Sequence, residues 1–123
     1  MSNAHEHTDR REHARFEVLD VAMIEDPSKS DPVRAVIIDV SLGGIQVRAR
    51  ETFDKNSFVL VQIGRPGEEP IRIPAEIRYC KDTEKSELFA AGLKVRPKGN
   101  LERIAWVNYV HSVFQDQGES LTS

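Results

Sequence analysis

The sequence lacks several features that mark secreted and membrane-bound proteins. Its 123 residues include a single cysteine, Cys80, which excludes an intrachain disulfide and favours a reducing compartment. No apolar run approaches the roughly 20 residues of a membrane-spanning helix, and the amino-terminal segment lacks the apolar core of a signal peptide. These absences predict a cytoplasmic protein that does not insert into a membrane.

An excess of positive charge is also missing. The chain carries 17 Lys and Arg against 20 Asp and Glu, a formal net charge of −3. General binding to DNA or RNA needs a basic face that displaces counterions from the phosphates. We therefore expect no DNA or RNA partner.

Patterns of catalysis and of metal binding are absent as well. There is no phosphate-binding P-loop, no G-x-S-x-G nucleophile elbow and no paired spacing of nucleophile and base. His5 and His7 form an H-x-H pattern, but no cysteine or carboxylate set completes a metal site, so we expect a solvated tail over residues 1–9. The sequence predicts neither an enzyme, nor a cofactor, nor a metal site.

The chain does contain a series of short segments in which apolar and polar residues alternate, as in half-buried strands. The predicted strands cover residues 16–24, 33–40, 45–48, 57–64, 71–80 and 88–95. No helical pattern separates them, which indicates an antiparallel sandwich or barrel. A helix follows, with Asn100 as its N-cap, and runs to about Gln117. We expect one domain over residues 10–117 and a polar tail over residues 118–123.

Strict alternation assigns the side chains of these strands to two faces. In the second predicted strand Val36, Ile38 and Val40 share one face, and Asp39 points to the opposite one. In the fifth, Tyr79 is in phase with the apolar residues before it, so we expect it in the core. In the first strand the alternation changes phase near residues 18–19, which predicts a β-bulge there.

Two short motifs stand beside these strands. The first reads R-x-x-x-R and the second reads D-x-S-x-x-G, at the turn between the second and third predicted strands. Their residues are Arg11 and Arg15, preceded by Arg10, and Asp39, Ser41, Gly43 and Gly44. In this order, with the strand pattern around them, the motifs resemble those of the PilZ domain, the bacterial receptor module for cyclic di-GMP. The resemblance covers roughly residues 10–115 and implies a mainly β fold, a six-stranded antiparallel β-barrel with one C-terminal α-helix.

The resemblance implies that the arginines bind the nucleotide. An arginine offers a planar fork that bonds the O6 and N7 atoms of guanine, or a phosphate, with two parallel hydrogen bonds. Arg11 and Arg15 match the family's ligand-binding arginines. Arg10 precedes them, and family members with an arginine at that place tend to bind an intercalated pair of cyclic di-GMP molecules. The alternative is that Arg10 is a solvated residue of the tail.

The turn motif supplies the complementary groups. The Asp39 carboxylate can accept from guanine N1–H and N2–H together, and the Ser41 hydroxyl can donate to a phosphate or a guanine. Gly43 and Gly44 permit positive φ and a close approach of the backbone to a ligand. The alternative is a capped turn without a ligand. Alternation also places Arg78 and Lys94 outside the barrel, where they could join the site or remain solvated.

The C-terminal helix is apolar around most of its circumference. Such a helix is buried on more than one side, so it either packs across the barrel mouth alone or also meets a partner or a second copy. The candidate homodimer surface consists of Trp106, Tyr109, Val110, Val113 and Phe114.

The function that these observations favour is a cyclic di-GMP receptor or adaptor, which changes conformation on binding the nucleotide and signals to a downstream protein. The alternative function is a β-barrel adaptor that binds no nucleotide and acts through protein contacts of its C-terminal helix. The sequence does not identify that downstream protein.

Overall fold

The computed structural model describes residues 16–17, 20–65, 67–84 and 86–122. All its strands pair antiparallel in one sheet, and a single helix follows them. The elements are β1 (Phe16–Glu17), β2 (Val21–Glu25), β3 (Val33–Val40), β4 (Gly44–Ala49), β5 (Phe58–Gly64), β6 (Ile71–Asp82), β7 (Phe89–Val95) and α2 (Asn100–Thr122).

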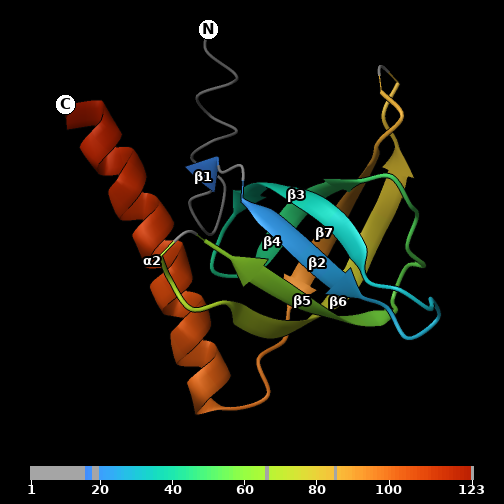
Figure 1. The fold of residues 1–123 in the computed structure, drawn as a ribbon, viewed down its shortest axis with the longest axis horizontal. Coiled ribbons are helices and arrows are strands. Elements are labelled where there is room, and N and C mark those ends of the chain that lie inside the picture. Colours follow the sequence, from blue (N-terminus) through green and yellow to red (C-terminus); the bar gives the residue numbers. More distant parts are fainter. Residues whose placement is uncertain (1–15, 18–19, 66, 85, 123) are drawn as a thin grey trace, which may run out of the picture.

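The sheet closes into a barrel (Figure 1). Its strand order is β1-β3-β2-β5-β6-β7-β4, and an additional pairing between β3 and β4 joins the two sides. Strands β2 to β7 form the six-stranded wall, and the two-residue strand β1 is added to β3 next to it. Closure leaves the wall without free edges, and the predicted six-stranded antiparallel barrel with a C-terminal helix is confirmed.

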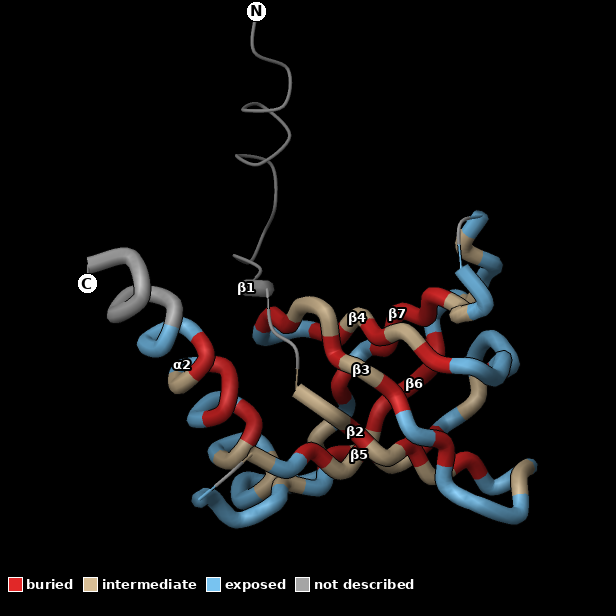
Figure 2. Tube along the Cα trace, turned by 45° about the horizontal axis from the view of Figure 1, so that its top comes forward, coloured by how far each residue is buried: buried red, intermediate tan, exposed pale blue. Residues whose placement is uncertain are grey.

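The core lies inside the barrel, because every second side chain of each strand points inward. Figure 2 shows buried positions alternating with half-buried or exposed ones along the strands. In β5, for example, Val59, Val61 and Ile63 are buried, as the alternation predicts. In β7, Ala91 and Leu93 are buried as well.

Two register shifts change which residues face the core. In β3 the pairing with β4 shifts between Ile37 and Asp39, so Ala35 and Ile37 point inward. The expectation that Val36, Ile38 and Val40 would share one face was wrong, because Val40, beyond the shift, is buried whereas Val36 and Ile38 are only half-buried. A bulge adds one residue to one strand, and this exchanges the two faces on either side of it.

The second shift lies in β6, between Ile77 and Tyr79. Ile73 and Ile77 are buried, but Tyr79 is turned outward and is 36% exposed. The expectation that Tyr79 belongs to the core was therefore wrong, and Cys80 packs against the core instead.

The first predicted strand is divided into β1 and β2. Phe16 is opposite Val40, whereas Val21 is opposite Val36, so the pairing of this segment with β3 moves by one residue between β1 and β2. The bulge predicted near residues 18–19 lies outside the described residues.

Helix α2 packs across one end of the barrel, with one side turned to the core (Figures 1 and 2). Trp106, Tyr109, Val110 and Val113 are buried in the same cluster as the strands. These four residues were predicted as a homodimer surface, and that prediction was wrong because the barrel of the same chain covers them. Of the predicted set only Phe114 is exposed, at 51%.

The helix also extends to Thr122, beyond the predicted end at Gln117. A glycine inside a helix costs about 1 kcal/mol relative to alanine and does not have to end it, and Gly118 lies within α2. Among the described residues no helix is long and apolar enough to cross a membrane.

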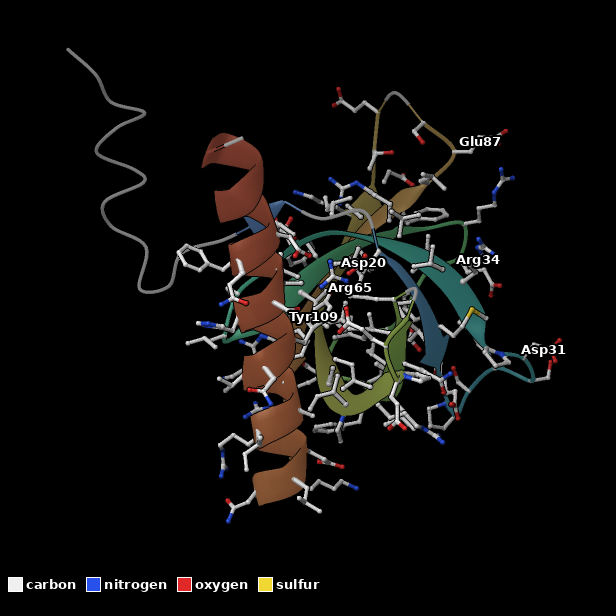
Figure 3. All side chains as sticks on the ribbon, turned by 60° about the vertical axis from the view of Figure 1, so that its left-hand side comes forward. Asp20, Asp31, Arg34, Arg65, Glu87 and Tyr109 are labelled. Atoms are coloured by element: carbon white, nitrogen blue, oxygen red, sulfur yellow. The ribbon has the colours of Figure 1, made fainter. Side chains whose placement is uncertain are left out.

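A partly buried polar cluster fixes α2 to the barrel (Figure 3). The Tyr109 hydroxyl donates to Asp20 Oδ2 at 2.8 Å, and Arg65 Nε lies 3.2 Å from the same oxygen. Arg65 Nη1 also donates to the Ser112 hydroxyl at 2.9 Å. Burial, together with the hydrogen bond to Asp20, raises the pKa of Tyr109. The hydroxyl therefore stays protonated and keeps its role as donor.

Candidate functional site

The D-x-S-x-x-G motif forms the tight turn between β3 and β4. The Ser41 N–H donates to the Gly44 carbonyl at 2.9 Å, and the Gly44 N–H donates back to the Ser41 carbonyl at 3.4 Å. Gly44 is required because its backbone passes close to β7: a Cβ there would lie 2.6 Å from the Leu93 carbonyl oxygen. Its φ lies outside the left-handed region, so close approach, and not positive φ, explains this glycine.

The strand register extends the turn into a surface on the outside of the barrel. Asp39 of β3 is opposite Gln46 of β4, Gln46 is opposite Gly92 of β7, and Gly92 is opposite Tyr79 of β6. These four residues form one row across four strands. Asp39 is half-buried and belongs to this outer row, as its predicted orientation requires.

A second row runs beside the first. Gly44 is opposite Lys94, and Lys94 is opposite Glu76 of β6. Between the rows the surface is hollowed, with a volume of about 310 Å³. The lining residues are Ser41, Gly43, Gly44, Ile45, Gln46, Arg78, Tyr79, Gly92, Leu93 and Lys94. We call this hollow the turn pocket.

The turn pocket brings together most of the predicted site residues that the structure describes. Ser41, Gly43 and Gly44 of the turn line it together with Arg78 and Lys94, which alternation placed outside the barrel. Asp39 is not among the lining residues and lies at the end of the first row, next to Gln46. Because the turn residues and the basic residues come from separate strands, they meet only through the pairing of β4 with β7 and of β7 with β6.

Tyr79 was predicted in the core, but it lines the turn pocket on the outside of the barrel. Its ring lies over Gly92, where an added methyl group would overlap the ring carbons. The Lys81 Nζ lies 5.5 Å from the ring centroid, within the range of a cation–π contact. A glycine in the interior of a strand often marks a close approach of another group, and that signal, at Gly92, was present in the sequence.

The charges around the turn pocket are partly compensated by Glu76, which is opposite Lys94 in the strand register. Arg96 Nη2 lies 2.7 Å from Glu76 Oε1, and Arg78 Nη1 lies 3.7 Å from Glu76 Oε2. The hydrogen bond from Arg96, with smaller contributions from Arg78 and Lys94, lowers the pKa of Glu76. The carboxylate is therefore ionised at neutral pH and orients Arg96, while among the described residues the pocket itself is lined by two basic side chains and no carboxylate.

The predicted ligand arginines, Arg10, Arg11 and Arg15, lie outside the described residues. Their place in the chain is nevertheless informative. Arg15 directly precedes β1, and Phe16 of β1 is opposite Val40, one residue before Ser41. The R-x-x-x-R segment therefore joins the fold beside the D-x-S-x-x-G turn.

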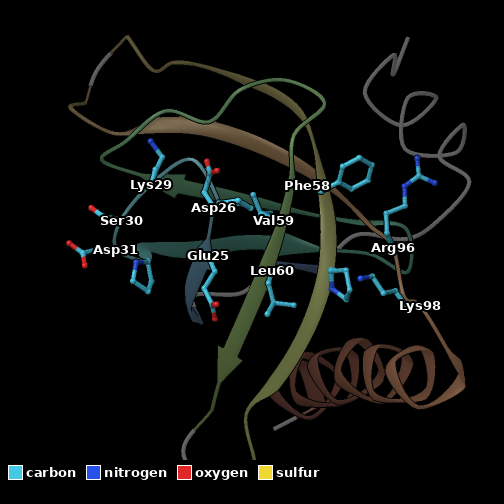
Figure 4. Close-up of a pocket in the computed structure, with 13 residues that line it drawn as sticks. Glu25, Asp26, Lys29, Ser30, Asp31, Phe58, Val59, Leu60, Arg96 and Lys98 are labelled. Carbon is cyan, nitrogen blue, oxygen red and sulfur yellow. The ribbon is translucent and has the colours of Figure 1, made fainter.

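A larger hollow of about 680 Å³ lies elsewhere on the barrel (Figure 4). Its lining combines the loop between β2 and β3 with the outer face of β5, and includes Phe58, Leu60, Arg96 and Lys98. None of the predicted site residues that the structure describes lines it. The turn pocket is the better candidate because motif residues from the turn and basic residues from two other strands meet there.

Comparison with known families decides the identity of the fold. The family model of the PilZ domain matches residues 9–111. The chain belongs to the PilZ domain family. This assignment rests on most of the chain and includes both motifs.

Solved PilZ structures share the fold at low sequence identity. The PilZ domain of YcgR from Escherichia coli, determined with c-di-GMP, is 11% identical, with a TM-score of 0.74; the match covers 93% of this chain and 98% of that one. The PilZ domain of CeSA from a cellulose-synthesising bacterium is 14% identical, with a TM-score of 0.64, over 81% of this chain and 97% of that one.

A third structure is longer than this chain. The Bacillus subtilis inhibitor of motility, MotI/DgrA, is 21% identical, with a TM-score of 0.70 over 89% of this chain, and this chain spans about half of its length, 52%. No curated protein matches the chain by sequence.

Proposed function

We propose that this PilZ domain is a cytoplasmic receptor for cyclic di-GMP that transmits ligand binding to a downstream protein. The observation that carries the proposal is the turn pocket, where Ser41 and Gly44 of the family motif line one hollow together with Arg78 and Lys94. A PilZ domain of the same fold, that of YcgR, has been solved with c-di-GMP. Cys80, as a lone cysteine, is compatible with the reducing conditions of the cytoplasm.

The proposed roles follow from the chemistry of the groups. The ligand has two anionic phosphates and two guanines. Arg78 and Lys94 supply positive charge for a phosphate, and Ser41 supplies a short donor beside it. Asp39 accepts from the N1–H and N2–H edge of a guanine at the other end of the first row, while Gly43 and Gly44 keep the turn close to the ligand.

Arg10, Arg11 and Arg15 complete the proposed site from the N-terminal side. Arg11 precedes Phe16 by five residues, so at about 3.3 Å per residue it can lie up to roughly 17 Å from β1. This reach is sufficient for guanidinium groups to contact bases or phosphates above the turn. With Arg10 included, we propose that two intercalated cyclic di-GMP molecules bind to each chain.

Tyr79 adds a stacking surface to this proposal. Aromatic rings bind nucleobases face to face, and the Tyr79 ring is fixed on the outer surface by its contact with Gly92. We propose that one guanine stacks on Tyr79 while its edge is bound by arginine. The ring thereby positions the base, and the polar groups select guanine.

Helix α2 is the element that we propose to transmit the signal. The Trp106 indole N–H donates to the carbonyl of Leu42, within the turn motif, at 2.9 Å. Tyr109, one turn further along the helix, is bonded to Asp20, just before β2. The helix is thus hydrogen-bonded to both chain segments that flank the proposed site, so a displacement of either segment by ligand changes the contacts of the helix.

Isothermal titration calorimetry with cyclic di-GMP tests the proposal. We expect Arg11→Ala and Arg15→Ala each to weaken binding by roughly 1.5–3 kcal/mol, because each removes charge-assisted hydrogen bonds. Lys98→Ala, at an exposed lysine of the larger hollow, is the matched control and should bind as the wild type does. Cyclic di-AMP should compete poorly, because adenine has an N6 donor in place of the guanine O6 acceptor.

Absence of heat and of chemical-shift change at high micromolar cyclic di-GMP would overturn the receptor proposal. The second candidate, an adaptor that acts through α2 without a nucleotide, would then take its place. The observation in favour of the adaptor is the set of exposed apolar side chains on α2, at Leu101, Ile104, Val107 and Phe114.

A further inference from the structure

A second apolar surface of α2 points away from the barrel. Ile104, Val107 and Phe114 are 55%, 44% and 51% exposed, and His111 between them is exposed as well. We call these four residues the outer seam. In Figure 2 the buried side of α2 faces the barrel and exposed positions lie on its other side.

The outer seam has the spacing of a coiled-coil contact. Its residues are separated by three, four and three positions, which are the intervals between successive a and d positions of a heptad. At 100° per residue Ile104 and His111 lie within about 20° of the side opposite the buried residue Val113, whereas Val107 and Phe114 lie about 120° and about 100° from it. Leu101, which is 85% exposed, lies one turn before Ile104 and extends the surface toward the start of the helix.

We propose that the outer seam pairs with the outer seam of a second copy of this chain, in antiparallel orientation. Antiparallel pairing about Tyr109 places Ile104 opposite the partner's Phe114, and Val107 opposite the partner's His111. It thereby matches bulky groups with smaller ones and separates the two histidines. It also aligns the two helix dipoles favourably.

Charge and shape agree with this orientation. Among the residues that directly flank the seam, Arg103, Asn108, Val110 and Gln115, only Arg103 is charged. In the antiparallel pair the two Arg103 side chains lie at opposite ends of the interface and do not repel each other. Because the barrel covers the opposite side of α2 (Figure 1), the two barrels lie on the outer sides of the helix pair.

The available area indicates a weak dimer. Leu101, Ile104, Val107 and Phe114 are between 44% and 85% exposed. If large side chains bury on the order of 200 Å² each, the four offer roughly 450 Å² per copy. Two copies then bury roughly 900 Å² before the flanking polar residues are counted, close to the lower bound of about 1,000 Å² for specific interfaces. We expect dissociation in the micromolar range.

Sedimentation equilibrium of the full chain without nucleotide tests the proposal. The wild type should dimerise at tens of micromolar, and Val107→Glu and Phe114→Glu should each raise the dissociation constant by at least about tenfold, because they bring carboxylates into an apolar contact. Phe58→Glu is the matched control, since Phe58 is 63% exposed on β5, in the larger hollow. This variant should dimerise as the wild type does.

Disulfide trapping distinguishes the two orientations, in a Cys80→Ser background. An equimolar mixture of the Ile104→Cys and Phe114→Cys variants should form the mixed disulfide, whereas Ile104→Cys alone should not, because the two copies of this residue lie about 15 Å apart along an antiparallel pair. A strong disulfide in Ile104→Cys alone would overturn the antiparallel pairing. A wild type that stays monomeric near millimolar concentration, or a dimer that only Phe58→Glu dissociates, would overturn the proposal as a whole.

Discussion

Replacing Tyr79 by alanine tests the proposed stacking surface most directly. Stacking of a base on an aromatic side chain contributes about 1–3 kcal/mol, which corresponds to roughly a 5- to 150-fold change in affinity. Tyr79 is 36% exposed and its ring already rests on Gly92, so a base that stacks on it has to displace only the flexible Lys81 side chain. We expect Tyr79→Ala to weaken cyclic di-GMP binding within that range, and Tyr79→Phe to bind nearly as the wild type does.

The assay is calorimetric titration, with circular dichroism to verify that each variant is folded. Phe58→Ala removes a more exposed aromatic ring from another part of the barrel and should leave the affinity unchanged. Affinity of Tyr79→Ala within twofold of the wild type would refute the stacking role. An equal loss in Tyr79→Phe and Tyr79→Ala would show that the hydroxyl, and not the ring, acts on the ligand.

Three further predictions follow from other contacts. Trp106→Phe should lower the free energy of unfolding in urea by roughly 1–3 kcal/mol, because it removes the hydrogen bond to Leu42 and some buried volume; an unchanged midpoint would contradict this. Arg96 lowers the pKa of Glu76 from its ordinary 4.5. Their pairing therefore stabilises the fold above about pH 4.5, and this stabilisation is lost as pH falls through the lowered pKa. Glu76→Gln should accordingly reduce the fall in the free energy of unfolding at acid pH, measured as a function of pH. Arg10→Leu should reduce the calorimetric count from two nucleotides per chain toward one, and a wild-type count of one would disprove the paired ligand.

The barrel could be predicted from the sequence because half-buried strands alternate strictly. The prediction was wrong where the chain forms bulges, since one additional residue in a strand leaves the apolar pattern almost unchanged but exchanges the faces. For this reason Val36 and Ile38 were expected on the same face as Val40, and Tyr79 was expected in the core. Bulge positions depend on pairing between strands, and pairing is a property of the folded sheet.

The candidate site could be predicted only in part, because pairing between strands also decides which of its residues lie together. Ser41, Gly43 and Gly44 are adjacent in the sequence, so their motif could be recognised directly. Arg78 and Lys94 could be placed on the outer surface by alternation, but that they share one pocket with the turn follows only from the pairing of β6, β7 and β4. A helical wheel could not predict which side of α2 faces the barrel either, because apolar residues occur on nearly every side of the helix.

The polar contacts of α2 explain which of its sides faces the barrel. Trp106 and Tyr109 each combine a large apolar ring with a donor group, and their partners, the Leu42 carbonyl and the Asp20 carboxylate, lie at the same end of the barrel. Leu101 and Phe114 have no polar group to satisfy. Burying the first pair forms two hydrogen bonds in addition to apolar contact, whereas burying the second pair would leave both donors without these partners.

This arrangement gives the two surfaces of α2 different tasks in the functions that we propose. The inner side is bonded to the segments flanking the nucleotide site, and the outer seam, on the same rigid helix, is the proposed contact with a second copy. If binding of nucleotide moves α2, it changes the free energy of dimerisation, and by thermodynamic linkage dimerisation then changes nucleotide affinity by the same factor. The hydrogen bond between Trp106 and Leu42 is the contact through which that coupling would act, because it joins the turn motif directly to the helix that carries the seam.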